Sequence, residues 1–102
     1  MTAVIQSLYF PHVEKNFDAN YIAQVMSKHK LAKVSSVHIE PYEITNQQQP
    51  KLYNRAYVQI HEWQQGAAAH AFIRALHNQN VETRLVHSDD NWWAVAINPH
   101  SP

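Results

Sequence analysis

The sequence predicts an α+β fold in which an antiparallel sheet carries two helices on one of its faces. Two observations predict this class. Segments rich in β-forming residues and segments with helical spacing follow one another in the order β-α-β-β-α-β. Apolar residues make up 45% of the 102 residues, which is enough for one hydrophobic core. No internal repeat or change in composition divides the chain, so we expect a single domain over residues 1–102.

The first strand and the first helix are predicted from residues near the N-terminus. Residues 4–10, VIQSLYF, are β-prone and are followed by Pro11, so the strand is expected to stop there. Asp18 is a residue type that caps free helical amides, and apolar residues recur at helical spacing after it. We therefore expect a helix over residues 18–29 with one apolar face.

Two further strands and a polar connection are predicted in the middle of the chain. Val34, Val37 and Ile39 indicate a second strand ending near Pro41. Residues 43–50 are polar and rich in Gln, which is typical of a loop. Residues 53–60, YNRAYVQI, read as the third strand.

A second helix is predicted over residues 64–79, because apolar residues recur there at helical spacing. The expected inward stripe consists of Ala68, Ala71, Phe72, Ala75 and Leu76.

The C-terminal part predicts a β-hairpin, with strands over 81–87 and 92–98 and a turn over 88–91. Together these elements predict a ferredoxin-like β-α-β-β-α-β sandwich. Its four-stranded antiparallel sheet would carry both helices on one face, with an extra strand from the C-terminal hairpin. The other face would be open, and function is expected there.

Composition excludes several kinds of site. There are no Cys and one Gly, so a disulfide framework, a cysteine zinc site and a glycine-rich phosphate loop are excluded. The eight His show no HExxH spacing, so we expect no metal and no cofactor. No apolar run is long enough to span a membrane, and no basic segment precedes the apolar N-terminal residues as in a signal peptide. An intracellular protein, in cytoplasm or nucleus, is expected.

Two strands resemble the signatures of the RNA recognition motif. The third strand, YNRAYVQI, matches the octamer K/R-G-F/Y-G/A-F-V-x-F/Y at Ala56, Tyr57 and Val58 but departs from it at four other positions. The first strand offers LYFPHV, residues 8–13, which resembles the family's hexamer. The resemblance places Tyr9, Arg55 and Tyr57 on the open face of the sheet.

Strand alternation independently assigns side chains to the two faces. Tyr9 alternates with the apolar Leu8 and Phe10, and Tyr57 alternates with Ala56 and Val58. By the same alternation His38 and Trp92 point outward, whereas Trp93, Val95 and Ile97 point inward. The candidate site is therefore Tyr9, Tyr57, Arg55, His38 and Trp92.

A narrower likeness comes from FPHV, KVSSVHIEPYE, YNRAYVQIHEW and the DD-x-WW hairpin. Together they are similar to small RNA-recognition-motif-like proteins encoded by large eukaryotic DNA viruses. This resemblance implies a viral protein acting inside a host cell.

The leading hypothesis is a non-catalytic module that binds single-stranded RNA or DNA. Tyr9 and Tyr57 would stack on bases, Arg55 would contact phosphate or base, and His38 and Trp92 would extend the platform. The alternative is a protein-interaction module or homodimer of the same fold, because Lys plus Arg equal Asp plus Glu at 8 each. β-Strands are also rich in Tyr for structural reasons alone. An enzyme is not expected, because the small phosphatases with this topology need a phosphate cradle that one Gly does not provide.

Overall fold

The described residues form two helices and a five-stranded antiparallel sheet, which confirms the predicted α+β class. The computed structural model describes residues 5–44, 51–78, 80, 82–88 and 91–98. Its elements are β1 (Ser7–Glu14), α1 (Ala19–Lys28), β2 (Ala32–Ile44), β3 (Lys51–Trp63), α2 (Ala67–His77), β4 (Thr83–Ser88) and β5 (Asn91–Ile97). Residues 45–50 of the predicted loop and residues 89–90 of the predicted turn lie outside the described residues.

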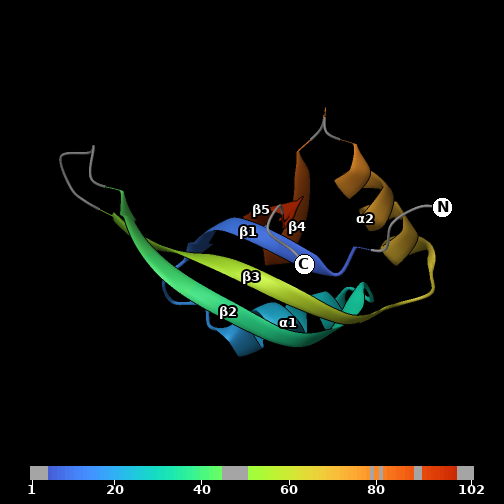
Figure 1. Ribbon diagram of the computed structural model, residues 1–102, viewed down its shortest axis with the longest axis horizontal. Helices are drawn as coiled ribbons and strands as arrows, with labels where there is room; N and C mark the ends of the chain where they lie inside the picture. The colour runs from blue at the N-terminus through green and yellow to red at the C-terminus, as the bar shows by residue number, and fades with distance from the viewer. Residues whose placement is uncertain (1–4, 45–50, 79, 81, 89–90, 99–102) are drawn as a thin grey trace.

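The strand order in the sheet is β2-β3-β1-β5-β4, and every neighbouring pair is antiparallel. Strands that are neighbours in sequence, β1 and β2, are separated in the sheet by β3, because α1 connects them. This arrangement is consistent with a ferredoxin-like fold, and β4 is the extra hairpin strand at the edge (Figure 1).

Both helices contribute to one hydrophobic core with the inward side chains of the strands, so they cover the same face of the sheet. Figure 1 shows α1 lying along β2 and α2 beside the β4-β5 hairpin. The buried helical members of this core are Ile22, Val25 and Met26 of α1 and Leu76 of α2. No helix in the described ranges is long and apolar enough to cross a membrane.

The start of α1 agrees with the sequence-based prediction. Asp18 is the N-cap, and its Oδ1 accepts a hydrogen bond of 2.8 Å from the backbone amide of Tyr21. At the other end, Lys30 adopts a positive φ of 58°, which turns the chain out of the helix toward β2. The helix spans Ala19–Lys28.

The predictions that prolines end the first two strands are wrong. β1 continues through Pro11 to Glu14, because an irregularity in the β1–β3 register between Phe10 and Val13 accommodates the missing amide. β2 continues through Pro41 to Ile44, because β2 is an edge strand whose proline needs no amide on the open side. Both strands therefore extend further toward the β2–β3 turn than expected.

The second helix begins later than predicted, and its buried stripe includes the predicted Phe72 and Leu76 but differs at other positions. The backbone amide of Gln64 donates to the Leu31 carbonyl, so this residue prolongs the β2–β3 pairing rather than starting α2. β3 runs to Trp63, beyond the predicted end at residue 60, and α2 covers only Ala67–His77. Ala68 and Ala71 of the predicted stripe are exposed. The inward residues are Ala69, Phe72, Ile73 and Leu76.

The C-terminal hairpin forms as predicted, within slightly different bounds. Trp93 points inward and is 1% exposed, whereas Trp92 points to the other face and is 39% exposed. Val95 is buried as expected. Ile97 pairs with the buried Leu8, as its predicted inward orientation requires, but its side chain is still 37% exposed.

Candidate functional site

An aromatic row crosses the open face of the sheet on three neighbouring strands. Tyr57 of β3 pairs directly with Tyr9 of β1 on one side and with His38 of β2 on the other. The ring centroids of Tyr9 and Tyr57 are 5.2 Å apart, and those of Tyr57 and His38 are 6.1 Å apart. Both distances are within the usual range of aromatic pairs. We call these three residues the aromatic row.

The two tyrosines of the row are half-buried, although the sequence predicted that their rings face solvent. The reason is their mutual contact, since each ring covers part of its neighbour across the strand pair. His38, at the end of the row on the edge strand β2, is exposed as predicted.

A second group of side chains lies on the same face, nearer the β2–β3 turn. Tyr42 of β2 pairs with Tyr53 of β3, and their ring centroids are 6.2 Å apart. His12 of β1 lies 3.7 Å from the Tyr53 ring centroid, with 38° between the ring planes. His12 Nδ1 and the Tyr42 hydroxyl share a hydrogen bond of 2.9 Å, whose donor depends on the His12 tautomer. We call His12, Tyr42 and Tyr53 the distal cluster.

The position of His12 follows from the irregularity in β1. Strict alternation from Tyr9 would turn His12 toward the core. Between Phe10 and Val13 the register to β3 shifts by one residue, so Pro11 and His12 together oppose Arg55. Val13 is then fully buried, and His12 is exposed on the face that carries the tyrosines.

Arg55 lies on β3 between Tyr53 and Tyr57. Its guanidinium carbon is 4.5 Å from the Tyr42 ring centroid, which is within cation–π range. Glu40 is its cross-strand neighbour, yet the described residues contain no carboxylate within salt-bridge distance of this guanidinium. A half-buried guanidinium without an acidic partner is suited to an external anion.

Burial raises the pKa of the Tyr42 hydroxyl, and the positive charge of Arg55 partly opposes that rise. Tyr42 is therefore a neutral phenol at physiological pH, and its hydroxyl can hold His12 in place. The distal cluster is thus fixed by ring contacts, one hydrogen bond and one cation–π contact.

Trp92 lies on the same face but apart from these groups. The Arg84 guanidinium is 4.1 Å from the Trp92 ring centroid, and Arg84 Nε also forms a 3.3 Å ion pair with Glu82. Ala96, and not Trp92, is the β5 residue that pairs with Tyr9. Trp92 is four residues from Ala96, which is about 14 Å along a strand. Among the described residues no ring contact joins Trp92 to a tyrosine of the open face.

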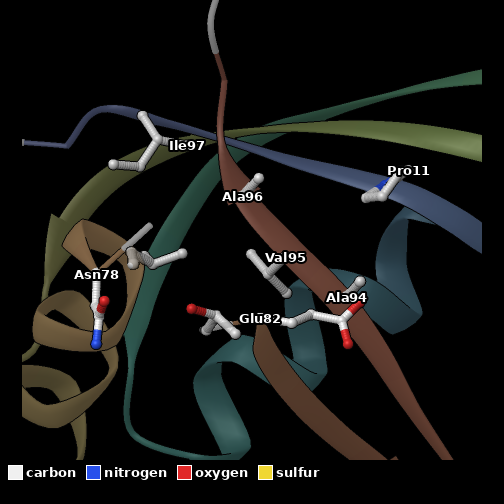
Figure 2. Close-up of a pocket in the computed structure, with 9 residues that line it drawn as sticks. Pro11, Asn78, Glu82, Ala94, Val95, Ala96 and Ile97 are labelled. Atoms are coloured by element: carbon white, nitrogen blue, oxygen red, sulfur yellow. The ribbon is translucent and has the colours of Figure 1, made fainter. Parts of the chain in front are cut away.

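A pocket of about 440 Å³ lies beside β5, where β1 and β5 separate beyond their two paired positions. Figure 2 shows its lining along β5, with Pro11 of β1 opposite Ala94 and Ala96. Its other walls come from the end of α2 and the start of β4, including Leu76, Asn78, Glu82 and Thr83. The pocket therefore lies between β5 and the end of α2, and neither the aromatic row nor Trp92 lines it.

The predicted site residues thus share one face, and four of them lie together. Tyr9, Tyr57 and His38 form the aromatic row, Arg55 adjoins it, and Trp92 stands apart. Sequence reasoning missed His12, Tyr42 and Tyr53. Alternation along the third strand already placed Tyr53 with Tyr57, so that tyrosine was detectable. His12 depended on the register shift, and Tyr42 depended on β2 continuing past Pro41.

The described residues contain no group of three His, Asp or Glu side chains placed to hold a metal ion. The arrangement offers flat aromatic surfaces, imidazole groups and the Arg55 guanidinium, which has no carboxylate within salt-bridge distance among the described residues. These are the chemical groups that stack on planar rings and contact phosphate.

A scan against protein-family models, a search of curated proteins and a search of solved structures each found no match to this chain.

Proposed function

We propose that this domain is a non-catalytic module, similar to an RNA recognition motif, that binds single-stranded RNA or DNA on its open sheet face. The observation that carries the proposal is the aromatic row, in which rings from three strands line up at 5.2 and 6.1 Å. Such a row offers π-faces to unpaired bases, and each stacked base contributes about 1–3 kcal/mol. Arg55 lies two residues along β3 from Tyr57, on the same face, where its guanidinium could contact the backbone phosphate.

The net charge predicts a modest dependence on salt. With Lys plus Arg at 8 and Asp plus Glu at 8, the domain has no general attraction for a polyanion. Affinity would come from stacking and from a few local cations. Removing the Arg55 charge is expected to reduce the slope of log affinity against log salt by about 0.7, the value for one phosphate of a single strand.

Substitution of the stacking tyrosines tests the proposal. Tyr9→Ala and Tyr57→Ala are each expected to lose about 1–3 kcal/mol of binding to a labelled single strand at low salt. Phe at either position should retain most of the affinity, because stacking needs the ring and not the hydroxyl. His70→Ala, an exposed change on α2, is the control. Indistinguishable titrations for the wild type and both Ala variants would exclude the aromatic row as a binding platform.

A second candidate function, a protein-interaction module, is favoured by the β4-β5 hairpin. Val86 and Trp92 pair across its two strands and are 47% and 39% exposed, at the edge of the sheet. Exposed Trp is enriched at interaction hot spots. Under this alternative, light scattering would detect a dimer that Trp92→Ala dissociates, and the wild type would not bind single strands.

A further inference from the structure

The distal cluster lies outside the positions to which the RNA recognition motif resemblance gives a role. Tyr53 occupies the first octamer position, where the signature has Lys or Arg. His12 reaches the face only through the register shift in β1, and Tyr42 only because β2 passes Pro41. The open face therefore carries a second aromatic surface beyond the aromatic row.

This surface is accessible and already ordered. His12 is exposed, its ring rests on the Tyr53 ring at 3.7 Å, and its Nδ1 is held by the Tyr42 hydroxyl at 2.9 Å. A ring fixed in this way loses little conformational freedom when another ring stacks on it. The cluster is thus prepared for a planar ligand without rearrangement.

The spacing of the two surfaces suits one strand with a phosphate between two bases. Tyr53 and Tyr57 are four residues apart on β3, which is about 14 Å along the strand. Stacked bases rise by about 3.4 Å, so nucleotides several steps apart would occupy the two surfaces. Arg55 lies between them, and its guanidinium has no carboxylate within salt-bridge distance among the described residues.

We propose that the distal cluster is a second base-stacking subsite, and that a single strand must span from it to the aromatic row, past Arg55, for full affinity. This inference depends on the proposed function. Its distinguishing consequence is a dependence on strand length. A dinucleotide reaches only one surface, whereas an octanucleotide engages both.

The test is a length series of oligouridylate and oligodeoxythymidylate from two to eight nucleotides, titrated against the full chain at low salt. Wild-type affinity is expected to rise steeply between two and about six nucleotides. Tyr53→Ala should lower octanucleotide affinity by about 5- to 150-fold, which corresponds to one lost stacking contact. In Tyr53→Ala the affinity should stop rising with strand length after a few nucleotides, while the dinucleotide should bind as it binds the wild type. Comparison of the two series shows whether the subsite prefers RNA or DNA.

His12→Ala is a second variant that guards against loss of folding, because this side chain is exposed. It should weaken octanucleotide binding in the same length-dependent way, and His70→Ala on α2 is its matched control. Tyr57→Ala, by contrast, should weaken stacking on the aromatic row, so that the strand binds mainly through the distal cluster.

The outcomes separate this inference from the proposed function. If the wild type binds and Tyr53→Ala and His12→Ala keep the wild-type length dependence, the second subsite is refuted while the aromatic row stands. If both variants lose affinity equally at every length, the distal cluster does not act as a separate subsite. If no strand of any length binds the wild type, the proposed function fails and this inference fails with it.

Discussion

The hydrogen bond between Trp93 and Glu14 should be a large local contribution to stability. Trp93 is 1% exposed, and its Nε1–H donates to Glu14 Oε2 at 2.9 Å. The Trp93 ring also packs against Phe10, Phe17 and His87 in the core. Glu14→Ala would leave a buried donor without its acceptor, at a cost of about 1–3 kcal/mol. Glu14→Gln keeps an acceptor oxygen and should cost clearly less.

Urea denaturation followed by far-UV circular dichroism measures this difference. For a typical slope of about 1–3 kcal/mol per molar urea, a loss of about 2 kcal/mol lowers the midpoint by roughly 1 M. Trp93→Phe is the reference background, because it removes the donor while keeping an aromatic ring. In the Trp93→Phe background, Glu14→Ala should lower the free energy of unfolding much less than it does in the wild type. The difference between the two effects measures the interaction between Trp93 and Glu14. Equal midpoints for the wild type, Glu14→Ala and Glu14→Gln would refute the proposed contribution.

Three further predictions concern the cap, a buried imidazole and binding. Asp18→Ala should lower stability by about 0.5–2 kcal/mol, because the Tyr21 amide loses its acceptor, and an unchanged urea midpoint would contradict this. Burial lowers the pKa of His87, and the negative charge of Glu14 partly opposes this effect. Below about pH 6.5 the unfolded chain therefore binds a proton at this residue more readily than the folded protein does, so stability falls as the pH decreases from that value. His87→Phe should flatten that loss between pH 7 and 5, and an equal pH dependence in both proteins would argue against it. If single strands bind, affinity should rise and its salt dependence steepen from about pH 7.5 to 6, because a chain with zero formal charge carries eight His. An identical slope of affinity against salt at the two pH values would show that His protonation does not contribute to binding.

Local sequence patterns were sufficient for the features that depend on nearby residues. The cap at Asp18, the order of the elements and the opposite orientations of Trp92 and Trp93 all follow from spacings of a few residues. Where helices and strands are regular, their periods determine which near neighbours share a face.

The buried face of α2 was not decided by its own sequence. Alanine is apolar on every side of this helix, so several stripes of helical spacing fit equally well. Packing against the strands selected Ala69, Phe72, Ile73 and Leu76, since α2 contacts β4 and β5 and the Phe72 ring lies beside Trp63 of β3.

Contacts between distant strands were decided by the tertiary structure alone. A proline ends a strand only where its missing amide is needed, and neither Pro11 at the register shift nor Pro41 on an edge strand meets that condition. The same shift brought His12 against Tyr53, although alternation along β1 pointed it inward. The sequence by itself therefore determined the fold class and the open face with Tyr9 and Tyr57. Strand register, which arises from pairing between residues far apart in the chain, decided which side chains meet on that face.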